Sequence, residues 1–269
     1  MPSKQHVRKK KKHSVLAAFF TAVLFCLAVG AFLLALNLNT LLNSCGDGGN
    51  PCPPQAGSDS QTPDANATTA APISESLEEY IAGTIFIGDS RTNGMVQYGY
   101  VPRNNAYAID GANHIAARTE RFLILSANGR KLTIPEAIGV VKPKRIIVSF
   151  GVNGVSFLDE ERFISGYEQL LDDLIAQSPD SVIAVQSILP VSASRETGTD
   201  AMSNSKIDRY NLLLREMAER RGIRYLDTAP LLKNAYGKLD GLYDSGDGLH
   251  FNEQAYQVLF DYFDKNRLY

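Results

Sequence analysis

Short apolar runs alternate with amphipathic stretches after residue 76, and this alternation constrains the fold more than any other feature. Near-continuous apolar runs are typical of parallel strands that are covered on both faces. The sequence therefore predicts a three-layer α/β/α sandwich with a central parallel sheet, whose functional groups gather at the carboxyl ends of the strands. The predicted strands cover residues 84–87, 106–109, 145–150, 182–186 and 224–226, and apolar helical faces lie within residues 163–175, 207–217 and 256–263.

One long uncharged segment, Ser14–Leu38, precedes this pattern. It exceeds the roughly 20 helical residues that cross a bilayer, so it predicts one transmembrane helix. A cleaved signal peptide is the alternative, but its apolar region is usually about 7–15 residues long. Residues 1–13 hold a basic cluster, and no acidic residue precedes Asp47. The positive-inside rule then predicts a single-pass cell-membrane protein with a cytoplasmic N-terminus and an extracellular catalytic domain.

The remaining charges are mostly acidic. Beyond the six basic residues of the first twelve positions, 21 basic residues stand against 29 acidic ones. A nucleic-acid partner would need a basic face, so none is expected.

Residues 39–75 are rich in Gly, Pro, Ser, Thr, Asp and Asn and predict a disordered linker. Cys45 and Cys52 lie in this segment, where an extracellular location and the spacing permit a disulfide without requiring one. The folded domain is expected over residues 76–269. Ser76 and Glu79 form a capping-box pattern that predicts a short helix at its start.

The first predicted strand ends in Gly88-Asp89-Ser90. This position puts Ser90 at the carboxyl edge of the sheet, where a nucleophile would be exposed. The same residues could simply cap a helix, because Asp and Ser are common there for hydrogen-bonding reasons alone.

Histidine narrows the search for a base, because the predicted extracellular part holds only His114 and His250. His250 ends the Gly-rich run DSGDGLH, and an imidazole can take the proton of a serine hydroxyl near neutral pH. Asp247, three residues earlier, is placed to hold the ring in one tautomer. For His114, just past Gly111, a surface or substrate-side position is expected rather than a catalytic one.

The order of these motifs resembles that of the SGNH/GDSL hydrolases. The resemblance covers this chain from about residue 77 to residue 269. Ser90 matches the nucleophile block, and Asp247 with His250 matches the last block. The resemblance implies that Gly111, after the second strand, and Asn153, in Gly151-Val152-Asn153, complete an oxyanion hole with the N–H of Ser90. It also implies a flavodoxin-like sheet.

Two residues depart from the family pattern. Gly154 stands where the family commonly has Asp, and Arg91 replaces the Leu of the GDSL name. Arg91 is expected either to contact an acidic substrate or to be a solvated residue of the first helical turn, and surface frequencies favour the second.

The resemblance implies acyl transfer through an acyl-enzyme. We therefore expect a membrane-anchored extracellular serine esterase, a carboxylic-ester hydrolase that removes short acyl groups, chiefly O-acetyl, from cell-wall or other carbohydrates. An O-acyltransferase that uses the same triad, and a non-catalytic glycan-binding module, remain alternatives. The sequence lacks HExxH, CxxC and GxxxxGK[ST], so neither a metal nor a cofactor is predicted. The expected partners are the acyl ester and the membrane, and the chain is expected to be a monomer.

Overall fold

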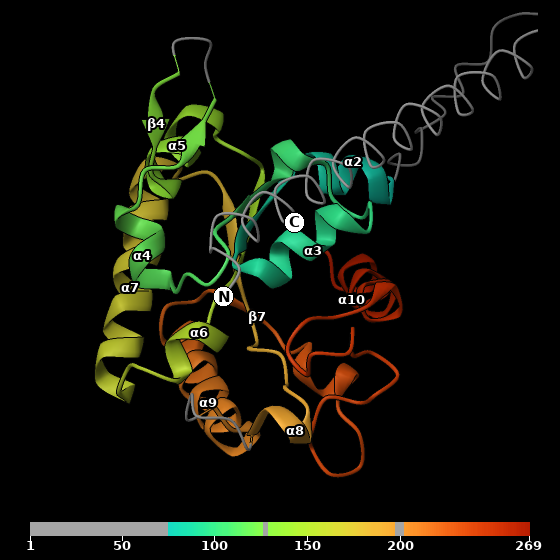
Figure 1. Ribbon diagram of the computed structural model, residues 1–269. Helices are drawn as coiled ribbons and strands as arrows, with labels where there is room; N and C mark the ends of the chain where they lie inside the picture. Colours follow the sequence, from blue (N-terminus) through green and yellow to red (C-terminus); the bar gives the residue numbers. More distant parts are fainter. Residues whose placement is uncertain (1–74, 126–128, 197–201) are drawn as a thin grey trace, which may run out of the picture. The chain divides into compact units, whose positions relative to one another are not determined.

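The computed structural model describes residues 75–125, 129–196 and 202–269, and a five-stranded sheet forms the centre of this part (Figure 1). Its strand order is β2-β1-β5-β6-β7, and every neighbouring pair is parallel. The order reverses between β1 and β5, which marks the carboxyl ends of these two strands as the usual place for a ligand. The strands are β1 (Thr84–Gly88), β2 (Ala106–Ala108), β5 (Arg145–Ser149), β6 (Val182–Gln186) and β7 (Arg224–Leu226).

Helices cover both faces of this sheet, which confirms the predicted three-layer α/β/α architecture with its parallel sheet. Four helices share a core with one face: α4 (His114–Thr119), α5 (Ile134–Val141), α7 (Glu160–Gln177) and α9 (Asn204–Arg220). Two pack on the other: α3 (Ser90–Gln97) and α10 (Glu253–Lys265). The shorter elements are α2 (Leu77–Ala82), α6 (Val152–Val155), α8 (Ala193–Glu196), η1 (Arg103–Asn105) and η2 (Ala229–Leu232).

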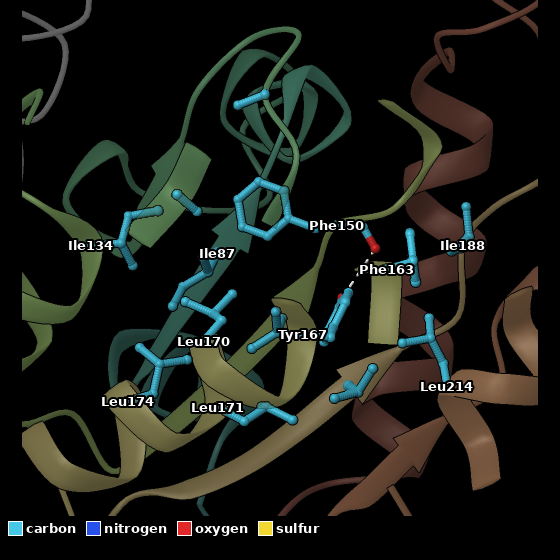
Figure 2. Close-up of a cluster of buried hydrophobic side chains, with 14 of the residues drawn as sticks. Ile87, Ile134, Phe150, Phe163, Tyr167, Leu170, Leu171, Leu174, Ile188 and Leu214 are labelled. Carbon is cyan, nitrogen blue, oxygen red and sulfur yellow. Dashed lines mark hydrogen bonds between the residues drawn. The ribbon is translucent and has the colours of Figure 1, made fainter. Parts of the chain in front are cut away.

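Successive side chains along a strand enter different cores, as the two-residue period of a strand requires. Ile85 and Ile87 of β1 belong to the core under α7, whereas Phe86 between them belongs to the core under α10. Figure 2 shows the first core, where Leu170, Leu171 and Leu174 of α7 point toward the sheet. The buried Tyr167 hydroxyl donates a hydrogen bond of 3.0 Å to the Phe150 carbonyl just after β5, so the core also fixes the carboxyl edge.

A two-stranded antiparallel sheet, β3 (Leu123–Ile124) with β4 (Lys131–Leu132), was not predicted, and neither was α5. The pattern at the start of α5 could have revealed that helix. Thr133 and Glu136 form a capping box, each accepting a hydrogen bond from the backbone N–H of the other.

The predicted span over residues 14–38, the predicted linker up to Ser74 and the cysteine pair Cys45 and Cys52 lie outside the described residues. Among the residues that the structure describes, no helix is long and apolar enough to cross a membrane.

Candidate active site

Ser90 lies at the turn between β1 and α3, at the carboxyl edge of the sheet. Asp89 is the N-cap of α3, and its side chain accepts a hydrogen bond of 3.0 Å from the Arg91 N–H. Gly94 lets α10 approach α3 closely, because a Cβ there would lie 1.9 Å from the Tyr256 hydroxyl oxygen. That hydroxyl donates to the Arg91 carbonyl at 2.8 Å. The helix that begins at the serine is therefore held at its first turn.

His250 and Asp247 complete a hydrogen-bonded chain from the serine. The Ser90 Oγ lies 2.9 Å from His250 Nε2, and His250 Nδ1 lies 2.6 Å from Asp247 Oδ2. An ionised carboxylate only accepts hydrogen bonds, so Nδ1 carries a proton, and in the neutral ring Nε2 then has its lone pair free to accept from the serine hydroxyl. The arrangement can remove the hydroxyl proton as the oxygen attacks a carbonyl carbon.

The loop of residues 247–250 is built around the Asp247 carboxylate. Burial opposes its charge, but hydrogen bonds outweigh burial and hold the pKa of Asp247 below its ordinary value. They come from the backbone N–H groups of Leu249 and His250, at 2.9 and 2.8 Å, and from the imidazole. Gly248 has φ +76°, and a Cβ there would lie 2.2 Å from the Ser192 hydroxyl oxygen, so only glycine fits this loop.

Two of the three predicted oxyanion donors, Gly111 and Asn153, differ in their surroundings. Gly111 follows β2 on an exposed loop with φ +74°, and a Cβ there would meet no atom within 4 Å. Asn153 lies on α6 after β5, and its amide donates to the Ala112 carbonyl at 3.0 Å and to Asp89 Oδ2 at 3.2 Å. Asn153 therefore links the Gly111 loop to the residue before the nucleophile, and a role toward an oxyanion would require it to release one of these bonds.

Comparison with known proteins decides the family. The sequence model of the GDSL-like Lipase/Acylhydrolase family matches residues 86–258, which include Ser90, Asn153 and His250. The chain belongs to this family. Ester hydrolysis is the activity that membership indicates. No curated protein matches the sequence.

Solved structures of this family have the same fold at low sequence identity. A protein of Streptococcus pneumonia, provisionally assigned as a platelet activating factor, has a TM-score of 0.55 at 18% identity; the match covers 71% of this chain and 90% of that one. A GDSL-like lipase of Bacteroides thetaiotaomicron has a TM-score of 0.52 at 17% identity, with 68% and 86% covered. At such identities the likeness shows the fold alone.

Arg91, which replaces the Leu of the GDSL name, is 6% exposed, so the prediction of a solvated residue is wrong. Its guanidinium donates three hydrogen bonds to backbone carbonyls: to Leu189 at 2.8 Å, to Leu249 at 3.0 Å and to Pro190 at 3.1 Å. The guanidinium also lies 4.7 Å from the centre of the Phe251 ring. Burial lowers its pKa to about 10, so it stays charged at neutral pH. Arg91 thus ties α3 to the loop of residues 247–250, which we call the histidine loop, and its donors face the protein's own carbonyls rather than a substrate.

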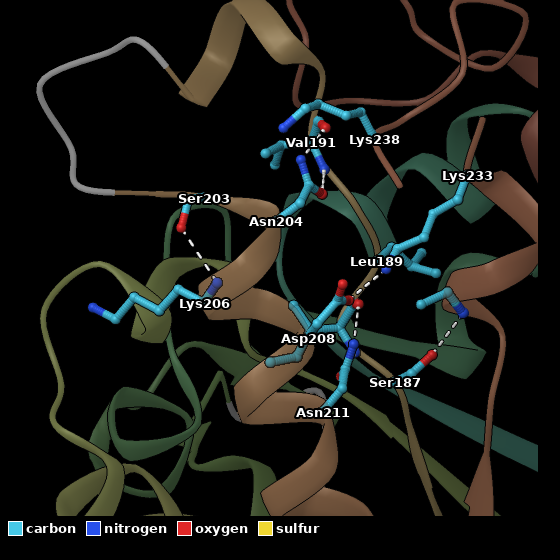
Figure 3. Close-up of polar contacts among 12 residues, drawn as sticks. Ser187, Leu189, Val191, Ser203, Asn204, Lys206, Asp208, Asn211, Lys233 and Lys238 are labelled. Carbon is cyan, nitrogen blue, oxygen red and sulfur yellow. Dashed lines mark hydrogen bonds and ion pairs between the residues drawn. The ribbon is translucent and has the colours of Figure 1, made fainter. Parts of the chain in front are cut away.

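The segment after β6 lies between these elements and is held on both sides. Asn204 and Asn211 of α9 each exchange two hydrogen bonds with its backbone, at Val191 and Ile188 respectively (Figure 3). Together with Arg91, they pair all four carbonyls of residues 188–191 with buried side chains. The Ser192 N–H then donates to the Gly248 carbonyl at 2.9 Å. We call residues 188–191, with Arg91, Asn204 and Asn211, the clamped loop.

His114 contradicts its predicted surface or substrate-side position, because it is fully buried. Its ring packs against Phe163 and Tyr167, with centroids 4.6 and 4.7 Å away, and neither ring nitrogen has a hydrogen-bond partner among the described residues. Gly166 of α7 makes room for the ring, since a Cβ there would lie 3.1 Å from its Nε2. Burial lowers the pKa of His114 to about 4, so the ring is neutral at pH 7.

Within the described residues, no group of three or more His, Cys, Asp or Glu side chains is arranged to hold a metal ion. That the chain needs neither a metal nor a cofactor stays a prediction from its sequence.

Proposed function

We propose that this chain is a membrane-anchored extracellular serine esterase that removes short acyl groups, chiefly O-acetyl, from cell-wall or other carbohydrates. The hydrogen-bonded chain from Ser90 through His250 to Asp247 is the observation that supports a serine mechanism most strongly. Ser90 would attack the ester carbonyl while His250 takes its proton, and an acyl-enzyme and an alcohol would result.

Exposure of the base favours hydrolysis over transfer. The side chains of His250 and Asp247 are 40% and 53% exposed, so water can reach the imidazole after the alcohol leaves. His250 would then take a proton from that water as it attacks the acyl-enzyme, which releases the free acid and restores Ser90. A transferase would need to keep water away from the same position.

Product analysis tests this proposal. The full chain in detergent, wild type beside Ser90→Ala, would be incubated with O-acetylated glycan, with and without an acceptor sugar. We expect free acetate from the wild type alone. Acetylated acceptor without free acetate would identify a transferase. Tight glycan binding with neither free acetate nor acetylated acceptor would support the non-catalytic glycan-binding module.

The oxyanion role of Asn153 needs its own test, because its amide already bonds to Ala112 and Asp89. Removing one oxyanion donor costs about 10²–10³-fold in kcat. We expect Asn153→Ala to lower kcat by such a factor while KM changes little. A variant with normal kcat and a lower melting temperature would show that Asn153 only links the two loops.

The proposed topology is tested separately. A protease added to intact cells should cleave the domain that contains Ser90 and leave the basic N-terminus intact. Protection of the domain until the cells are lysed would contradict an extracellular location.

A further inference from the structure

Exposed apolar side chains gather in one groove away from the active site. The described residues include ten large apolar side chains that are exposed, and four of them line this groove of about 570 Å³. They are Ile124 and Leu125 near the β3–β4 pair, and Val140 and Val141 at the end of α5, with 38% to 66% of each exposed. Scattered apolar residues are ordinary on a protein surface, whereas a contiguous group marks an interaction site.

The groove lies at the edge of the sheet opposite to Ser90. Its other lining residues include Gly83 and Ile85 at the start of β1, Asn105 just before β2 and Pro143 just before β5. These are the amino ends of parallel strands, whereas Ser90 follows the carboxyl end of β1. A molecule in the groove would therefore leave the active site open.

Lysines stand directly beside the apolar residues. Lys131 pairs across the β3–β4 sheet with Ile124, Lys142 follows Val141, and Lys144 follows Pro143. The Lys144 side chain is 73% exposed and lies 3.6 Å from Glu75. Glu79 of α2 also lies within electrostatic reach of Lys144 and offsets part of its charge. Aliphatic side chains can enter the interface of a bilayer, and lysines around them can keep their charged groups at the level of the lipid headgroups.

The chain enters the domain at this same edge. Glu75, the first described residue, contacts Lys144 and Arg145, and Arg145 begins β5. The sequence predicts a membrane span that ends at Leu38 and a disordered linker after it. A flexible chain of about 36 residues has a root-mean-square length of roughly 30–36 Å. The predicted tether thus keeps the groove within reach of the membrane.

We propose that the four apolar residues of this groove insert into the surface of the membrane that anchors the chain, so that Ser90 faces away from the lipid. The proposal rests on the proposed membrane anchoring and is independent of the esterase activity. Amphipathic helices that lie in the interface bury their apolar face to a depth of about 5–10 Å, and we expect a comparable depth for these four side chains.

The absence of tryptophan from the whole chain makes a direct test possible. The full chain carrying Val140→Trp would be reconstituted into phosphatidylcholine vesicles with and without phosphatidylglycerol, and its fluorescence compared with brominated lipids present. Leu212→Trp is the matched control, because Leu212 is 45% exposed on α9, at the other end of the domain from α5 (Figure 1). Val141→Trp serves as a second reporter.

We expect emission from positions 140 and 141 to shift to shorter wavelength and to be largely quenched by brominated lipid, with position 212 unaffected. Equal emission at all three positions would overturn the proposal. An emission wavelength at position 140 that shifts with protein concentration in the absence of lipid would also overturn it. That result would indicate that a second copy of the chain covers the groove. Flotation of the same vesicles after an alkaline wash reports membrane anchoring independently. A chain that floats with the vesicles but shows no quenching would contradict insertion of the groove and leave the membrane anchor supported.

Discussion

Two buried basic side chains, Arg91 and His114, flank the active site and are accommodated in opposite ways. Arg91 keeps its charge and places its donors on three backbone carbonyls. His114 has no hydrogen-bond partner among the described residues, and burial keeps it neutral at pH 7. A buried charge costs little only when it is fully paired, whereas a neutral ring can pack as an aromatic group. Arg91 therefore holds loops together, whereas His114 fills space between α4 and α7.

The largest effect should follow removal of Arg91. Arg91→Ala leaves the buried carbonyls of Leu189 and Pro190 and the half-buried carbonyl of Leu249 without a partner. At about 1–3 kcal/mol for each unpaired group, we expect a loss of about 3–5 kcal/mol of unfolding free energy. We expect denaturant unfolding to show this loss, with kcat falling because the histidine loop is no longer tied to the serine. Arg91→Lys should recover only part of it, since one ammonium cannot reach all three carbonyls. Arg209→Ala, an exposed arginine paired with Glu160, is the control and should unfold like the wild type.

A smaller effect is expected when His114 is forced to ionise. Its pKa in the folded chain is about 4, below the ordinary 6.5, so the unfolded chain binds more protons between these values. Stability must therefore fall as the pH drops from about 6.5 to 4, by on the order of 3 kcal/mol from this group. His114→Leu should lose this part of the pH dependence, as measured by denaturant unfolding at several pH values. If the unfolding free energy changed with pH equally in the wild type and in His114→Leu, that result would contradict a neutral, buried His114 ring.

The smallest effect should follow removal of Asn211, which holds the clamped loop from α9. Asn211→Ala leaves the N–H and the carbonyl of Ile188 unpaired while Arg91 still holds Leu189 and Pro190. A loss of about 1–3 kcal/mol of unfolding free energy is expected. Leu212→Ala, at the next and exposed position of α9, should have little effect. If Asn211→Ala matched Arg91→Ala in its cost, the loop would depend on all its contacts at once and the special role of Arg91 would be lost.

The sheet and the nucleophile turn could be predicted from the sequence because both depend on local patterns. Continuous apolar runs identify buried strands, and the ordered motifs grouped Ser90, Asp247 and His250 as the structure does. The role of Arg91 could not be read in this way. Its partners are backbone carbonyls 98 to 158 residues away along the chain. Every residue has such a carbonyl, so the residue types do not show which ones Arg91 contacts.

The burial of His114 depends on a similar distant fit. Phe163 and Tyr167 were placed correctly on one helical face, but nothing in their spacing shows that a ring from α4 packs against them. Gly166 within the predicted helix was the available signal, because glycine in a helix interior often marks a close approach.

Hydrolysis of p-nitrophenyl acetate by the full chain, wild type beside Ser90→Ala, tests the serine mechanism most directly. We expect steady release of p-nitrophenol by the wild type and only the uncatalysed rate with Ser90→Ala. A Ser90→Ala protein as active as the wild type would contradict Ser90 as the nucleophile.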